Sequence, residues 1–165
     1  MKDIRRANNL MERGEHANAA QLFERQARDA GDRGLYLQSA HLHLQAGRAR
    51  LLAGEEDTGA DHLRQGLKVL SERGKPRRLA LSGNLLLRDL ENLGQVQLEQ
   101  ELRNWLEQAL AGHPDAGANL TKESAERVSL PVKCSKCGAI LRGEDIERWD
   151  AGSLVCLYCG SLIGL

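Results

Sequence analysis

Apolar residues in the first two-thirds of the chain recur at helical spacing. Between residues 3 and 111 they fall three or four positions apart rather than alternating, and Pro76 is the one proline in that stretch. Pauses in the pattern predict six helices, each bounded to within a few residues: 3–13, 16–29, 35–53, 57–72, 77–92 and 96–111. The pattern therefore indicates three helical hairpins.

Glycines mark three of these pauses at a fixed interval. Gly14, Gly54 and Gly94 each follow an apolar run and are spaced by 40 residues. Two looser breaks are expected between them, at 30–34 and 72–76. A constant period of this size is typical of a helical repeat array, in which stacked hairpins bury a core that none could bury alone.

The first hairpin resembles a tetratricopeptide repeat. Ala7, Leu10, Gly14, Ala19 and Phe23 follow the order and spacing of the small, large, glycine, small and aromatic positions of that family. The resemblance covers about two-thirds of the chain and implies an α-solenoid of three hairpins. It places small residues where two helices cross, so that their backbones approach closely.

The later hairpins depart from this signature. In the second, Gly47 and Gly59 keep the small positions, but Arg50 stands where a large apolar residue is expected.

The third hairpin departs further. It has Glu99 and Arg103 at the small and aromatic positions, with Leu98 and Leu102 one residue earlier, so this hairpin is degenerate or slipped by one. The 40-residue period also exceeds the family's period of about 34 residues. We place the surplus in the long third helix.

Four cysteines near the C-terminus form two Cys-x-x-Cys-Gly motifs: Cys134, Cys137, Cys156 and Cys159. Two thiolates three positions apart on a tight turn can reach one ion, and two such turns complete a tetrahedron with sulfur about 2.3 Å from the metal. The glycine after each second cysteine permits positive φ. The motifs predict one Zn²⁺ ion. Because four cysteines close its coordination shell, we interpret the ion as structural, while an iron or iron–sulfur centre uses the same ligands.

Short apolar runs at 139–141 and 153–155 predict strands beside the cysteine motifs. A small core is expected from Trp149, Tyr158, Leu162 and Ile163. We therefore divide the chain into a helical repeat domain at 1–111, a linker at 112–130 and a β zinc ribbon at 131–165. The fold class expected is mainly α. A ribbon of about 35 residues cannot normally fold on apolar burial alone, so metal binding is expected to stabilise it.

Charge and composition limit the classes of function that fit the chain. Lysine plus arginine equals aspartate plus glutamate, at 23 each, which argues against a dedicated nucleic-acid binder. The cysteine motifs use all four cysteines, which fits a reducing compartment, and we expect a cytoplasmic protein. The first residues lack the apolar region of a signal peptide, and no apolar run approaches the length of about 20 residues that spans a bilayer.

The sequence has no catalytic constellation, so we expect a non-enzymatic protein. It contains neither a glycine-rich phosphate loop nor a Gly-x-Ser-x-Gly motif, and its five histidines lack the spacing of metal ligands. His41 and His43, two residues apart, are expected on different sides of a helix.

The resemblance implies a groove lined by the first helix of each hairpin. Asn8, Arg48 and Arg88 repeat at the 40-residue period and would lie along it. Such a row could hold an acidic peptide or a terminal carboxylate. The basic pattern of the family's carboxylate clamp is not reproduced.

Three functions fit these observations. The first is an adaptor that binds a protein or peptide partner and carries the zinc ribbon. The second is a regulator whose ribbon contacts nucleic acid, as other zinc ribbons do. The third is a scaffold that self-associates through the ends of its solenoid.

Overall fold

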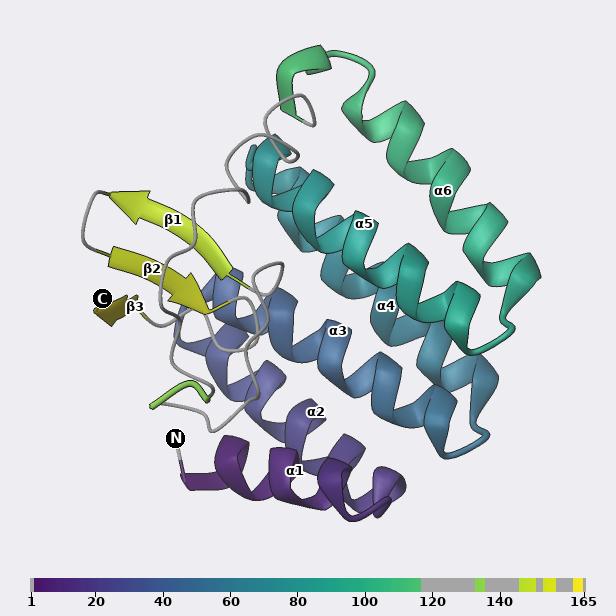
Figure 1. Ribbon diagram of the computed structural model, residues 1–165, viewed down its shortest axis with the longest axis vertical. Helices are drawn as coiled ribbons and strands as arrows, with labels where there is room; N and C mark the ends of the chain where they lie inside the picture. Colours follow the sequence, from purple (N-terminus) through teal and green to yellow (C-terminus); the bar gives the residue numbers. More distant parts are fainter. Residues whose placement is uncertain (1, 117–132, 136–145, 151–152, 157–161, 165) are drawn as a thin grey trace. The chain divides into compact units, whose positions relative to one another are not determined.

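The computed structural model describes residues 2–116, 133–135, 146–150, 153–156 and 162–164. This part of the chain is mainly helical (Figure 1), and its six α-helices are α1 (Lys2–Glu12), α2 (His16–Asp32), α3 (Tyr36–Leu52), α4 (Glu56–Glu72), α5 (Pro76–Asn92) and α6 (Val96–Leu110). A 3₁₀ turn follows at Pro114–Ala116. The predicted helix bounds differ from these by at most three residues. None of the described helices has the length and apolar character needed to cross a membrane.

All five turns between successive helices have the same form. Each contains a glycine in the left-handed region, with φ between 59° and 79°, and these glycines are 20 residues apart: Gly14, Gly34, Gly54, Gly74 and Gly94. At the turn after α3, the N–H of Gly54 bonds to the carbonyl of Leu51, and the N–H of Glu55 bonds to that of Arg50. This is a Schellman motif, and the other four turns repeat it.

The residue after each glycine also begins the next helix. The carbonyl of Glu55, for example, accepts the N–H of Gly59 as the first helical bond of α4. Consequently α2, α3, α4 and α5 each have 17 residues. Two expectations were therefore wrong. The breaks at 30–34 and 72–76 are no looser than the others, and the third helix holds no surplus, because α2, α3, α4 and α5 have the same length.

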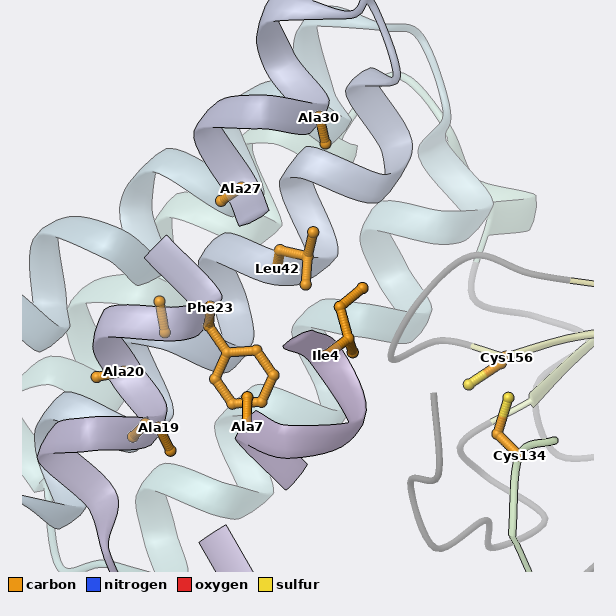
Figure 2. Close-up of a cluster of buried hydrophobic side chains, with 12 residues drawn as sticks. Ile4, Ala7, Ala19, Ala20, Phe23, Ala27, Ala30, Leu42, Cys134 and Cys156 are labelled. Atoms are coloured by element: carbon orange, nitrogen blue, oxygen red, sulfur yellow. The ribbon is translucent and has the colours of Figure 1, made fainter. Parts of the chain in front are cut away.

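The described chain divides into two compact units, one formed by 1–66 with 128–165 and the other by 67–127. In the first unit, α1, α2 and α3 run side by side (Figure 1). Phe23 is the one aromatic side chain in their buried cluster, which is otherwise mostly alanine (Figure 2). Its helical members are Ile4, Ala7, Ala19, Ala20, Phe23, Ala27, Ala30, Leu42, Ala46 and Ala49.

Helix α3 is buried on all sides. Its residues 39 to 42 are all buried, and four consecutive helical residues point to every side of a helix. One side packs on α2, and Ser39 donates a buried hydrogen bond of 2.8 Å to the carbonyl of Ala27. A helix buried all round needs small residues wherever another backbone comes close.

Glycines provide that space where α3 meets the first part of α4. A Cβ added to Gly47 would lie 2.6 Å from the Leu63 side chain and 2.8 Å from the carbonyl oxygen of Gly59. A Cβ on Gly66 would lie 2.8 Å from the carbonyl oxygen of Ala40. Gly47, Gly59 and Leu63 are signature positions of the second hairpin, and they meet at one crossing, as the resemblance implies.

In the second unit the crossing of α5 and α6 is displaced. A Cβ on Gly83 would lie 2.6 Å from the side chain of Leu106, so these two residues mark the close approach. At the position that corresponds to Ala7 and Gly47, the third hairpin has Leu87, which is too large for such an approach.

The buried positions of α6 agree with a slip by one residue. Leu98 and Leu102 are buried. Glu99 and Arg103 pair with each other, and the Arg103 side chain is 52% exposed.

Three strands of the first unit form an antiparallel sheet in the order β1 (Ile146–Asp150), β2 (Ser153–Cys156) and β3 (Leu162–Gly164). Ile146 is opposite Cys156, and Leu154 is opposite Ile163. The predicted strand at 153–155 is confirmed. The one at 139–141 and the core candidate Tyr158 lie outside the described residues, as do most of the predicted linker and ribbon. The predicted domain boundaries stay predictions.

Candidate functional site

Five charged or polar side chains gather where α2, α3 and the start of α4 meet, in the first unit. We call them the interhelical polar cluster: Glu24 of α2, His43 and Arg50 of α3, Glu55 of the following turn and His62 of α4. None of the five residues is fully exposed. The cluster therefore lies between α2, α3 and α4, partly screened from solvent.

Arg50 is the cation of this cluster. Its Nε is 2.6 Å from Oε1 of Glu24 and its Nη2 is 3.0 Å from Oε2, a bidentate pair. Its Nη1 donates to Oε2 of Glu55 at 2.6 Å. The side chains of Arg50 and Glu24 are 14% and 17% exposed. Arg50 thus joins its own helix to α2 and to the turn that leads into α4.

The carboxylate of Glu24 is held in its charged form. Burial raises the pKa of Glu24, but the hydrogen bond and charge of Arg50, with the charges of His62 and Arg28, outweigh burial and bring the pKa below its ordinary value. The same hydrogen bond raises the pKa of Arg50. The charged carboxylate also lies 3.3 Å from Nε2 of His62, close enough for its charge to favour hydrogen on that nitrogen.

His62 faces a second imidazole. Its Nδ1 is 3.0 Å from Nδ1 of His43, and the ring planes differ by 25°. The ring centres are 5.2 Å apart. This distance equals the separation of the two nitrogens plus the distance from each nitrogen to the centre of its own ring. The two nitrogens therefore lie nearly on the line between the centres, and the rings meet edge to edge. One nitrogen donates and the other accepts.

Burial lowers the pKa of His43 to about 4, helped by the charges of His62 and Arg28 and opposed by that of Glu24. His43 is therefore neutral at pH 7. A lowered pKa means that the unfolded chain binds more protons than the folded chain between pH 4 and 6.5. This group consequently stabilises the fold above pH 6.5 and loses that contribution as the pH falls towards 4.

The histidine pair was not predicted, because the spacing of the histidines was compared only within one helix. His41 and His43 do lie on different sides of α3, since His41 is buried in the core while His43 meets His62. In an antiparallel hairpin, residues at similar distances from the turn face each other. His43 precedes Gly54 by 11 residues and His62 follows it by eight. The sequence therefore contains two signals for this cluster. His43 and His62 lie at similar distances from Gly54, and Arg50 stands where an apolar residue is expected.

Two of the four predicted zinc ligands lie within the described residues. Cys134 and Cys156 are 2% and 0% exposed and belong to one buried cluster. Figure 2 shows the two cysteine side chains next to each other. Cys137 and Cys159 lie outside the described residues. Within the part that the structure describes, no group of three or more His, Cys, Asp or Glu side chains is arranged to hold a metal ion.

Residues on both sides of Cys134 contact α1. Arg5 donates a hydrogen bond to the carbonyl of Ser135, and Nζ of Lys133 lies 3.2 Å from Oε1 of Glu12. Arg5 and Glu12 are seven residues apart, so they share one face of the helix. Both contacts are solvent-exposed, and each contributes little to stability.

The predicted groove residues are distributed over both units. Asn8 and Arg48 are half-buried on α1 and α3 of the first unit, and Arg88 is exposed on α5 of the second. All three have interaction partners in the structure. The row that they would form stays a prediction.

Comparison of the chain with protein-family models, with curated proteins and with solved structures gave no match. The likeness to tetratricopeptide repeats accordingly rests on the residues and packing described above.

Replacing Arg50 by methionine is expected to destabilise the fold by about 1–3 kcal/mol, because Glu24 keeps a partly buried charge without its bidentate partner. The double change Glu24→Leu with Arg50→Met is expected to recover most of this loss. Urea unfolding of wild type, both single variants and the double variant measures the coupling.

As a control, Lys68→Met removes an ion pair with Glu72 whose side chains are 64% and 60% exposed, and it is expected to change stability by less than about 0.5 kcal/mol. Strictly additive effects of the Glu24 and Arg50 changes would contradict the assignment of the cluster as one coupled unit.

Proposed function

We propose that the chain is a non-enzymatic adaptor, a helical-repeat platform for a protein or peptide partner that also carries a structural zinc ribbon. The observation that supports this most is the repetition of one turn at every twentieth residue. In a repeat protein, recurring turns of this kind bring corresponding positions of successive hairpins into a row. Repeat proteins use such rows to bind an extended partner segment.

The proposed binding row consists of Asn8, Arg48 and Arg88, one from the first helix of each hairpin. Two guanidinium groups and an amide suit a partner with carboxylates, either an acidic peptide or a chain terminus. Guanidinium groups bind carboxylates with two parallel hydrogen bonds, which supplies orientation as well as affinity. The partner class that we propose is therefore an acidic peptide segment in the cytoplasm.

Binding of a fluorescent acidic peptide with a free terminal carboxylate tests this proposal. The Arg48→Ala, Arg88→Ala double variant is expected to bind at least about tenfold more weakly than wild type, because two charge-assisted contacts are lost. The control is Arg25→Ala with Arg103→Ala, an equal charge change on the second helices of their hairpins, and it is expected to bind like wild type. Equal binding by all three proteins, or binding by none, would refute the peptide-binding row.

We further propose that Cys134, Cys137, Cys156 and Cys159 hold one Zn²⁺ ion. The described half of this set supports the proposal, since Cys134 and Cys156 are buried in one cluster. Sulfur ligands suit Zn²⁺, and a shell of four cysteines leaves no position open for a reacting water. The role of the ion is to hold the two motifs together and so to stabilise the ribbon.

Elemental analysis of the reduced protein is expected to find one zinc per chain, and Cys137→Ser is expected to lower that content.

After chelation, near-UV and NMR signals of the ribbon, such as those of Trp149, should be lost while the helical far-UV signal persists, because the metal supplies most of the ribbon's folding energy. Ribbon signals that survive metal removal would show that the ion does not fold this segment.

A further inference from the structure

The contacts within the interhelical polar cluster determine where each imidazole carries its hydrogen. Nε2 of His62 lies 3.3 Å from the charged carboxylate of Glu24, which favours hydrogen rather than a lone pair on that nitrogen. In neutral His62, Nδ1 then carries a lone pair. Because this lone pair faces Nδ1 of His43 at 3.0 Å, His43 must hold its hydrogen on Nδ1. With both rings neutral, one of the two facing nitrogens donates and the other accepts.

Added protons affect this chain in two stages. A first proton leaves the contact between the rings intact, because one facing nitrogen can still donate while the other accepts. A second proton would place hydrogens on both facing nitrogens, removing the bond and bringing two cations together. The pair has one carboxylate beside it, Glu24, and Arg50 already neutralises that charge.

The remaining charges around the pair oppose double protonation as well. Arg28 of α2 is a further positive charge that acts on His43. Glu55, in the turn before α4, is directed to Arg50 rather than to either imidazole.

We propose that Glu24, His62 and His43 form a proton-sensitive clamp that joins α2, α4 and α3. The clamp is closed while the two imidazoles share one hydrogen bond, and it opens when both are protonated. Opening separates His62 of α4 from His43 of α3, while Arg50 still ties α3 to α2. The response to acid is therefore localised between α3 and α4. The lowered pKa of His43 agrees with this arrangement.

The pH dependence of unfolding tests the clamp in the full chain. Wild type is expected to take up about one proton more on unfolding at about pH 5 than His43→Asn, because asparagine can donate a hydrogen bond but cannot titrate. The proton number comes from the slope of the unfolding free energy against pH. His113→Asn, the same change at an exposed histidine of the second unit, should keep the wild-type slope. The same slope in His43→Asn and wild type would overturn the proposal.

Ring-nitrogen NMR gives a second test that needs no variant. At neutral pH, wild type should show hydrogen on Nδ1 of His43 and on Nε2 of His62. In His62→Leu, which offers no acceptor, Glu24 keeps its bonds to Arg50 but His43 loses its partner, so His43 should move its hydrogen to Nε2. A merely packed histidine would keep the same tautomer in both proteins. Finding Nε2–H at His43 in wild type would refute the clamp even if the asparagine variant does not fold.

Discussion

The turn at every twentieth residue is the constraint on which the rest of the helical structure depends. Each turn needs a residue with positive φ, and glycine supplies it without the strain that other residues incur. The same turn bonds the end of one helix and begins the next, which leaves no residue to absorb a change of length. Helices α2, α3, α4 and α5 are consequently equal in length.

Packing then depends on which residue stands at each recurring position. Where the first two hairpins have Ala7 and Gly47, helices can approach closely, and the core of the first unit can consist mostly of alanine around Phe23. Where the third hairpin has Leu87, the close approach is found at Gly83 instead. Arg50 is a different kind of departure. A partly buried cation at a position expected to be apolar needs negative charge beside it. The carboxylates of Glu24 and Glu55 provide that charge from neighbouring segments.

The sequence predicts the helices well because apolar spacing and glycine report local structure directly. It does not show that the five turns are equal, since Gly31 and Pro76 make two breaks resemble longer loops. In the structure only Gly34 and Gly74 take positive φ there, and Pro76 begins α5, where its missing N–H costs nothing. The sequence does not predict the contact of His43 with His62, because residue spacing within one helix carries no information about the neighbouring helix. Cysteine spacing predicts a complete ligand set, of which the described residues contain half.

The most direct measurement of the central claim is the unfolding free energy of variants at Gly54. A Cβ there meets no atom within 4 Å, so any loss of stability reports backbone conformation alone. Gly54→Ala is expected to lose about 1–2 kcal/mol, and Gly54→Asn less, because asparagine tolerates the left-handed region. If Gly54→Ala is as stable as wild type, the left-handed turn is not the constraint that spaces the helices.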